Sequence, residues 1–380
     1  MIRPLIENKR ILVCVGPGGV GKTTTAAALG VEAARLGRKT LVCTIDPAPR
    51  LADALGVGTL GPEPRPVPEE ACRALGIPAF DRLYAVRLDT ARAFARLVDE
   101  QVADPAMRRR IFDNPIYRQI TTTLTGSQEY AATLALYELA RGGGYDLIVL
   151  DTPPTANALD FLDAPKRISA AIGSPAIKWF ARPAGDSGKL FSLQRLRAGG
   201  ALVLRRMAKL VGSRFLDDLS AFLTDFQDVL AGFLDRAGAV DRLLRDADTA
   251  FLLVLAPVVA AVDEALYFHG RLRQAGVPLA GFIANRVQPA PGLTDDVGLV
   301  EALRATPAYA DLSDAAIGDA AARLGALART LRALHDSEGR EIARLAERAA
   351  ETAITQVPLL DRDVDNLVEL RVVGEALVAG

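Results

Sequence analysis

Residues 16–24 of this 380-residue chain read Gly-Pro-Gly-Gly-Val-Gly-Lys-Thr-Thr. The run matches GxxxxGK[ST], the phosphate-binding loop, and it lies between a predicted buried strand at 10–15 and a predicted helix at 23–36. Glycines let backbone N–H groups turn inward around phosphate oxygens, and the start of the helix adds a favourable dipole. We therefore expect a nucleotide to bind at Gly16, Gly18, Gly19, Val20, Gly21, Lys22, Thr23 and Thr24.

Two side chains of this loop have distinct predicted roles. Lys22 places a point charge beside the β- and γ-phosphates, so we count it as catalytic as well as binding. Thr23 offers its hydroxyl to Mg²⁺. The alternative is an ordinary glycine turn, which the flanking strand and helix argue against.

Carboxylates follow two further predicted strands. Asp46 ends the strand predicted at 39–45, and Asp151 ends the strand predicted at 145–150. In open α/β sheets ligands bind beyond the carboxyl ends of the strands, so both carboxylates can face the phosphates. One can hold the Mg²⁺ shell while the other orients the attacking water. A strand-end turn without a ligand is the alternative for each motif.

A third strand, predicted at 279–285, ends at Asn285. The amide of Asn285 offers both a donor and an acceptor to an adenine edge. A guanine-specific site would need an Asn-Lys-x-Asp run, but the chain reads Asn-Arg-Val-Gln at 285–288. The sequence therefore predicts ATP rather than GTP, with a simple strand-terminating asparagine as the alternative.

Short apolar runs alternate with helical patterns along the chain. This order predicts an α/β fold with a doubly wound, mostly parallel P-loop NTPase sheet, in a single domain over residues 1–380. The helical stretches 90–141 and 156–248 predict an inserted helical lobe. We further expect strands at 83–88, 250–255 and 353–357, helices at 262–274, 297–350 and 364–378, and a Pro/Gly-rich loop at 57–80.

Composition excludes several classes of function. Lys and Arg total 45 and Asp and Glu total 46, and no basic tail is present, so we expect no nucleic-acid partner. The three cysteines and two histidines lie far apart, which predicts neither a disulfide framework nor a zinc site. The longest apolar run, 250–262, is too short for a membrane helix. We expect a cytoplasmic protein, with peripheral association at a membrane left open.

Taken together, these motifs resemble one family. The loop, Asp46-Pro-Ala-Pro and Asp151-Thr-Pro-Pro-Thr are similar to motifs of the arsenite-pump and tail-anchored-protein-targeting (guided-entry) ATPases, and most of all to the single-domain bacterial members. The resemblance implies the deviant Walker A class and a nucleotide-gated dimer, either a homodimer or a heterodimer with a paralogue. It also implies roles for four residues: water activation by Asp46, Mg²⁺ support by Asp151, an adenine contact by Asn285, and a place beside the base for Pro358.

The chain departs from this family's pattern in its signature lysine. The second position of the glycine loop is Pro17, which carries no charge and no backbone N–H. Arg50, four residues beyond Asp46, is the catalytic candidate to replace the lysine as an arginine finger; the alternative is a solvated loop arginine. The family's zinc-binding cysteine pair and a cysteine cluster for arsenite are also missing, so we expect neither zinc nor arsenite extrusion.

Apolar stripes on two predicted helical segments bear on partners. The stripe at 215–233 predicts either a helix docked on its own lobe or a groove for an apolar helical protein client. The stripe at 317–334 predicts a core helix. Three functions remain open: an ATP-hydrolysing dimeric switch that binds or delivers a client, such as a membrane protein; an ATP-gated scaffold with negligible hydrolysis; and a small-molecule phosphotransferase.

Overall fold

The computed structural model describes most of the chain outside one long internal stretch. The described residues are 1–46, 48–115, 117–118, 127–152, 170, 222, 225, 227–277, 279–292, 296–309, 311–364 and 367–379. Most of the predicted lobe segment at 156–248 therefore lies outside the described residues, as does the continuation of the Asp151 motif at 153–157.

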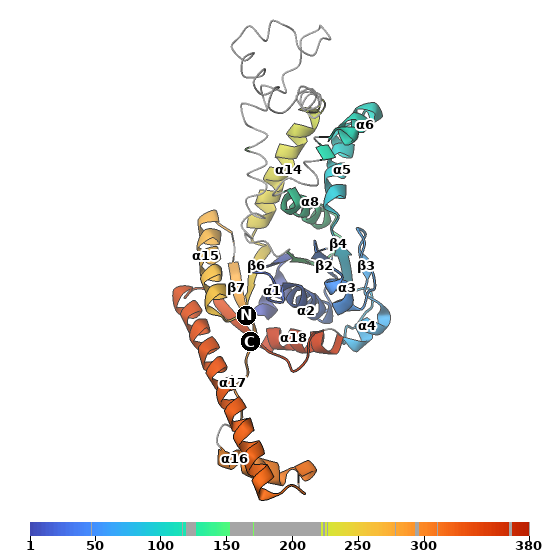
Figure 1. Cartoon of the computed structure of the whole chain (residues 1–380). Helices are drawn as coiled ribbons and strands as arrows, with labels where there is room; N and C mark the ends of the chain where they lie inside the picture. Colours follow the sequence, from blue (N-terminus) through green and yellow to red (C-terminus); the bar gives the residue numbers. More distant parts are fainter. Residues whose placement is uncertain are drawn as a thin grey trace.

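An eight-stranded sheet forms the centre of the molecule (Figure 1). Its strands lie in the order β3-β4-β2-β5-β1-β6-β7-β8, and the neighbouring pairs are parallel except for β3 with β4. This confirms the predicted fold class. The strands are β1 (Ile11–Val15), β2 (Thr40–Thr44), β3 (Arg65–Pro66), β4 (Leu83–Arg87), β5 (Leu147–Asp151), β6 (Thr249–Leu255), β7 (Leu279–Val287) and β8 (Ala353–Pro358).

The central strands are buried over their whole length. Every residue of β1, β2, β5 and β6 is buried, which is why their sequences are near-continuous apolar runs rather than alternating ones. Such strands need helices on both faces of the sheet, and the chain supplies them.

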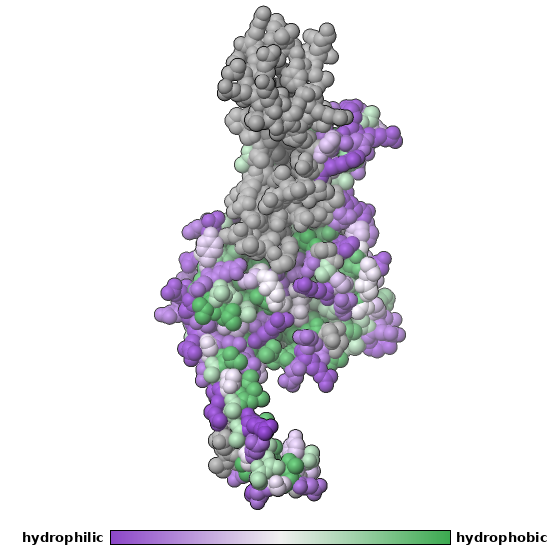
Figure 2. Space-filling view, viewed as in Figure 1, coloured by the Kyte–Doolittle hydropathy of each residue, from purple (hydrophilic) through white to green (hydrophobic). Residues whose placement is uncertain are grey.

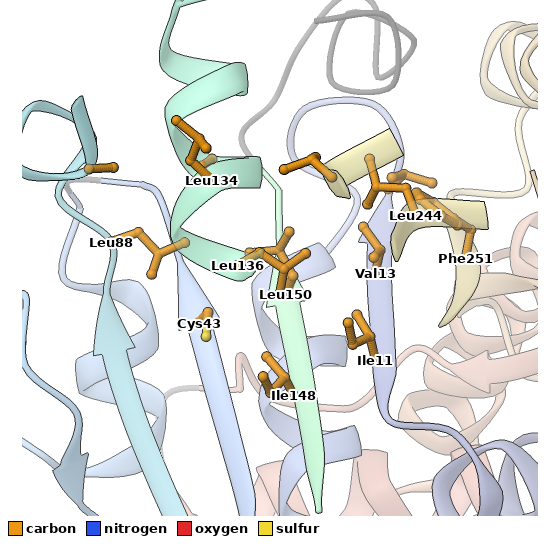
Figure 3. Close-up of a cluster of buried hydrophobic side chains, with 14 of the residues drawn as sticks. Ile11, Val13, Cys43, Leu88, Leu134, Leu136, Ile148, Leu150, Leu244 and Phe251 are labelled. Atoms are coloured by element: carbon orange, nitrogen blue, oxygen red, sulfur yellow. The ribbon is translucent and has the colours of Figure 1, made fainter. Parts of the chain in front are cut away.

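Helices cover both faces of the sheet and meet in two separate apolar clusters. One face carries α1 (Ile2–Asn8), α2 (Lys22–Arg35), α3 (Arg50–Leu55), α4 (Glu69–Ala74) and α18 (Leu367–Ala379). The other carries α5 (Thr90–Gln101), α6 (Pro105–Asp113), α8 (Ser127–Arg141), α14 (Gln227–Arg245), α15 (Val259–Ala275) and the end of α17 (Asp314–Arg348). Figure 3 shows part of this second cluster, in which leucines of α8 and α14 lie over β1 and β5.

Three segments in the N-terminal part of the chain differ from their predicted structure. The predicted loop at 57–80 contains β3 and α4, whose Ala71 and Cys72 are buried, so the loop prediction was wrong there. The helices α1 and α3 were not predicted at all. These elements are only 2 to 7 residues long, too short to show a helical or strand period in sequence.

The helix at 317–334 also differs from its prediction. It is part of α17, a 35-residue helix that extends away from the sheet and carries α16 (Asp296–Ala305) beside it (Figure 1). Ile317 is buried, but Leu324, Leu327 and Leu334 are 42%, 55% and 49% exposed. The prediction of a core helix was therefore wrong for this leucine-bearing face. A short 3₁₀ turn at Pro307–Tyr309 separates α16 from α17.

The apolar stripe at 215–233 is described at a few positions only. Phe222 and Val229 are buried in the cluster that covers the second face of the sheet, as expected of a helix docked on its own lobe. The side chains of the remaining phenylalanines of the stripe fall outside what the structure describes. Among the described helices, none combines the length and apolarity needed to cross a membrane.

Candidate functional site

The glycine loop follows β1 and turns at two positions that accept only glycine. A Cβ on Gly16 would lie 2.1 Å from the backbone oxygen of Val254, and one on Gly21 would lie 2.3 Å from Nδ2 of Asn285. Both residues have positive φ angles, 147° and 92°. The loop is therefore pressed against β6 and β7, and α2 begins directly after it at Lys22.

The order β2-β5-β1 brings the predicted acidic residues to this loop. Asp151 at the end of β5 pairs in register with Cys14 of β1 and Thr44 of β2. Its Oδ2 accepts hydrogen bonds from the hydroxyls of Thr23, at 2.7 Å, and Thr44, at 3.0 Å. The structure thus joins Asp151 directly to the predicted Mg²⁺ ligand Thr23.

The Asp151 carboxyl is almost completely buried, with 1% of its surface exposed. Its second oxygen, Oδ1, has no hydrogen-bond partner among the described residues. Burial raises its pKa to about 6, although the Thr23 and Thr44 hydroxyls and the Lys22 ammonium lower it. A buried oxygen that lacks a partner is costly, and a hard divalent cation is a ligand that would satisfy it. The residues present therefore fit Mg²⁺.

The backbone of the glycine loop holds the Lys22 side chain in place. Its Nζ donates a hydrogen bond of 2.7 Å to the carbonyl oxygen of Pro17. Burial lowers the pKa of this ammonium, and the nearby Asp151 carboxylate raises it again. A largely buried lysine with one neutral acceptor gains strongly from a phosphate oxygen, because charge-assisted hydrogen bonds are about twice as strong as neutral ones.

Two adjoining cavities lie above the loop. The larger, about 480 Å³, is lined by Lys22, Thr23, Asp46 and Arg50 together with Gly19, Gly21, Thr24, Asp53, Ala54, Thr152, Arg286 and Val364. The smaller, about 330 Å³, contains Asn285 and Pro358. The two share Gly21, Thr24, Arg286 and Val364, so a single elongated ligand can span both.

Asn285 lies at the junction of the loop and the smaller cavity. It is buried, and its Nδ2 donates a hydrogen bond of 2.8 Å to the backbone oxygen of Val20. This bond fixes the amide against the loop, a role that the sequence did not indicate. Asn285 and Pro358 line the same cavity. Their contacts with adenine remain predictions.

Asp46 and Arg50 lie together at the rim of the larger cavity. Asp46 Oδ1 accepts the backbone N–H of Ala48 at 2.9 Å, and its own N–H donates to Thr44 Oγ1 at 3.2 Å. Arg50 Nη1 is 3.8 Å from Asp46 Oδ2, and its side chain is 67% exposed. Asp46 is thus oriented by the backbone, whereas the contact of the Arg50 side chain within the described part of the chain is a long ion pair.

Arg286 is a cavity residue that sequence reasoning missed. It is the one non-glycine residue with a positive φ, 61°, in the described part of the chain, and its Nη1 donates to the backbone oxygen of Gly19 at 3.4 Å. A residue in this conformation is uncommon and worth explaining. Its position directly after Asn285 was the available signal, but no periodic pattern reveals a left-handed residue in sequence.

Residues 9–306 match the family model described as anion-transporting ATPase, which covers more than half of the chain. The chain belongs to the anion-transporting ATPase family. Membership of this family confirms the resemblance found in the sequence and the predicted ATPase class. Within the described residues, no group of His, Cys, Asp and Glu side chains has the arrangement of a metal cluster.

Individual relatives of the family carry different names. The chain is 28% identical to the putative arsenical pump-driving ATPase 1 of Aquifex aeolicus over 74% of its own length and 64% of that protein. It is 28% identical to ATPase GET3 of Malassezia globosa over 56% of its length and 59% of that protein. An uncharacterized protein of Streptomyces coelicolor is 36% identical over 43% of this chain and 39% of its own length. The chain thus spans less than two thirds of each of these relatives.

Asp151→Asn is expected to stabilise the nucleotide-free protein at neutral pH. The pKa of Asp151 is raised to about 6 from 3.8, so the cost of burying its charge is absent below the lower value and complete above the higher one. A shift of about two units corresponds to roughly 2–3 kcal/mol. Urea unfolding at about pH 7.5 should show this gain, and at about pH 4 the gain should largely vanish.

The matched control is Asp81→Asn, at a surface aspartate more than half exposed beside Arg82. It should leave the free energy of unfolding unchanged at both pH values. An Asp151→Asn protein less stable than the wild type at neutral pH would contradict the prediction.

Proposed function

We propose that this chain binds and hydrolyses MgATP at residues 16–24 and works as a dimeric, nucleotide-dependent switch. The observation that carries the proposal lies at the carboxyl edge of the sheet: Lys22 and Thr23 line one cavity there, and the buried Asp151 accepts the hydrogen bond of the Thr23 hydroxyl. Membership of an ATPase family supports it.

The loop would bind the phosphates. Its backbone N–H groups and the start of α2 favour negative charge, and Lys22 would exchange the Pro17 carbonyl for β- and γ-phosphate oxygens. A phosphate cluster is a stronger acceptor than a neutral carbonyl, so nucleotide binding is favoured over the present contact.

Thr23 and Asp151 would hold the metal ion. Mg²⁺, when bound, neutralises charge that develops on the phosphates. Asp151 Oδ2 already orients the Thr23 hydroxyl at 2.7 Å, and Oδ1 is the buried oxygen that lacks a partner. Thr44 keeps the carboxylate fixed from the neighbouring strand.

Asp46 would orient the attacking water and accept its proton. The Ala48 N–H binds one carboxylate oxygen and so sets the direction of the other, which lies on the Arg50 side. A correctly placed general base contributes about 10²–10⁴-fold to a rate. Arg50 would stabilise charge on the transferred phosphoryl group, in its own site or in a partner's site.

The base would occupy the smaller cavity. Asn285 and Pro358 line it, and Arg286 lies between it and the larger cavity. An amide is suited to an adenine edge, and the cavity continues directly from the phosphate loop. This arrangement supports ATP as the nucleotide.

Partners and location belong to the same proposal. One relative bears the name ATPase GET3 and another that of an arsenical pump-driving ATPase, so the family includes members associated with different tasks. We propose that the chain acts in the cytoplasm as a homodimer or with a paralogue, and that its cycle controls binding of an apolar helical client at 215–233. The cysteines Cys14, Cys43 and Cys72 are all buried, and we therefore propose no arsenite-binding role for them.

A second function is favoured by one observation, Pro17. The loop lacks the family's second-position lysine, so an ATP-gated scaffold that hydrolyses negligibly is the main alternative. Steady-state phosphate release from MgATP tests both. Turnover that is sensitive to changes at Lys22 supports the switch, whereas tight ATP binding without phosphate release supports the scaffold. Phosphate transfer to an added acceptor instead of water would indicate a phosphotransferase.

Lys22→Ala is expected to weaken ATP binding about 10- to 100-fold. The bound phosphates would lose their principal point charge in a mostly buried site. Titration calorimetry measures the affinity directly. Lys9→Ala is a matched control, since Lys9 Nζ also donates to a backbone carbonyl, that of Ala247. Unchanged ATP affinity in Lys22→Ala would contradict the site assignment.

A further inference from the structure

Thr44 is a polar residue buried at the end of β2. In the view of Figure 2, hydrophilic residues are spread over the surface of the described parts of the chain, where water satisfies their polar groups. Thr44 is 2% exposed, so its hydroxyl depends on partners within the protein. It has two, on different segments of the chain: the Asp151 carboxylate and the backbone N–H of Asp46.

The Thr44 hydroxyl donates one hydrogen bond and accepts the other. It donates to Asp151 Oδ2 at 3.0 Å, and its oxygen accepts the N–H of Asp46 at 3.2 Å. A hydroxyl has one donor and two acceptor lone pairs, so both bonds can form at the same time. Thr23 donates to the same Oδ2 at 2.7 Å. A continuous series of hydrogen bonds therefore runs from Thr23 through Asp151 and Thr44 to Asp46.

The sheet holds the backbone of Thr44 from both sides. Thr44 pairs with Asp151 of β5 and with Arg87 of β4, and its carbonyl oxygen accepts the N–H of Leu88 at 2.8 Å. β2 ends at Thr44, so Asp46 lies two residues beyond the strand. The Thr44 hydroxyl thus ties the start of the Asp46 segment to a rigid strand end.

Two hydrogen bonds position Asp46. Thr44 binds its backbone N–H, and the N–H of Ala48 binds its Oδ1. The first bond fixes the backbone of Asp46, and the second fixes the direction of its carboxylate. If the first bond is lost, the carboxylate keeps its charge but can shift in the cavity. A misplacement of about 1 Å can lower an enzymatic rate about 100-fold.

A purely local role is the alternative for Thr44. Threonine hydroxyls often bind the N–H two residues further along in turns, and such bonds need no functional explanation. The second bond of Thr44 is different, because Asp151 is 107 positions away in the chain and also orients the Thr23 hydroxyl. A threonine that only shapes a turn does not require this partner.

We propose that Thr44 is a positioning residue for ATP hydrolysis, whose hydroxyl holds Asp46 where it can orient the attacking water and joins it to the Asp151 carboxylate. This rests on the proposed function, in which Asp46 is the general base. Thr44 is not among the described residues that line the two cavities, so it acts through Asp46 rather than on the nucleotide. Loss of its hydroxyl therefore slows hydrolysis and leaves ATP binding almost unchanged.

Thr44→Val removes the hydroxyl and nearly keeps the shape of the side chain. We expect single-turnover hydrolysis of MgATP to slow about 10- to 100-fold, while ATP affinity in titration calorimetry stays within about threefold of the wild type. Thr44→Ser keeps the hydroxyl and should hydrolyse ATP within about threefold of the wild-type rate. Thr44→Ala removes the same hydroxyl and carries the same expectations if Thr44→Val does not fold.

The matched control is Thr40→Val, at a buried threonine at the other end of β2. The Thr40 hydroxyl donates to the backbone oxygen of Arg38 at 3.1 Å, so the control also removes a hydrogen bond. It should hydrolyse ATP like the wild type. Hydrolysis by Thr44→Val within about threefold of the wild-type rate would overturn the proposal, as would a Thr44→Ser protein as slow as Thr44→Val.

A double-mutant cycle tests whether Thr44 acts through Asp46. The base is absent in Asp46→Asn, so adding Thr44→Val to this variant should slow hydrolysis less than about twofold further. A general disturbance of the loop or the metal site would slow hydrolysis by the same factor with and without Asp46. Equal factors in the two backgrounds therefore overturn the proposal.

Amide hydrogen exchange of the nucleotide-free protein tests the Thr44–Asp46 hydrogen bond without ATP. Peptides that contain the Asp46 N–H should exchange it about 5- to 10-fold faster in Thr44→Val, and at the wild-type rate in Thr44→Ser and Thr40→Val. Unchanged exchange in Thr44→Val would overturn the proposal. Absence of phosphate release by the wild type would contradict the proposed function, whereas normal release by both the wild type and Thr44→Val would contradict only the role of Thr44.

Discussion

Asp46→Asn is expected to bind ATP with near-normal affinity and to hydrolyse it about 10²–10⁴ times more slowly. The amide keeps the shape of the carboxylate and can still accept the Ala48 N–H that orients it at 2.9 Å. It loses the negative charge that polarises water and takes up its proton. ATP should therefore bind normally while the hydrolysis step becomes slow. Titration calorimetry measures the binding step, and single-turnover phosphate release measures the hydrolysis step.

Asp81→Asn is again the control, because it makes the same chemical change at an exposed residue away from the cavities. If the nucleotide-gated dimer of the proposed function forms, the Asp46→Asn protein should accumulate in it with ATP. Normal turnover in Asp46→Asn would move the role of the base to another residue, and Asp151 would be the next to test.

Sequence reasoning identified residues that meet at the glycine loop because these residues are tied to strand ends. The loop at 16–24, Asp46 and Asp151 each follow an apolar run that became a buried strand of the sheet. Parallel strands present their carboxyl ends at one edge, so residues more than 100 positions apart in the chain meet there. The Thr23–Asp151 hydrogen bond is the direct result.

Features that depend on tertiary contacts were beyond sequence reasoning. Arg286 adopts a left-handed backbone conformation that cannot be predicted from a residue pattern. Asn285 donates a hydrogen bond from its side-chain amide to the backbone of the loop. The leucines of α17 have the period of a buried helix, but whether a periodic face meets the core depends on where the helix lies. Because α17 extends away from the sheet, the same pattern became an exposed row.

Replacing Arg50 tests whether this arginine takes the role of the family's signature lysine, which this chain lacks. Pro17 supplies neither charge nor a backbone donor, and Arg50 lines the larger cavity 3.8 Å from the Asp46 carboxylate. An exposed ion pair of this length contributes little to stability, so the side chain is able to leave Asp46 for a phosphate oxygen. Arg286 is the other arginine at the cavity, but its contact with Gly19 already places it at the loop backbone.

We expect Arg50→Ala to slow ATP hydrolysis about 10³-fold or more while ATP affinity changes far less, as for other arginine fingers. Arg73→Ala is the matched control, because Arg73 forms the same i,i+4 pair with Glu69 and is 74% exposed, but lies outside the cavities. If the finger acts in the partner's site, mixing Arg50→Ala with Lys22→Ala chains restores hydrolysis, because each mixed dimer then contains one complete site. Mixing has no effect if Arg50 acts within its own chain. Hydrolysis by Arg50→Ala within about threefold of the wild-type rate would show that Arg50 is a surface arginine, and the replacement for the lysine would have to be sought at Arg286.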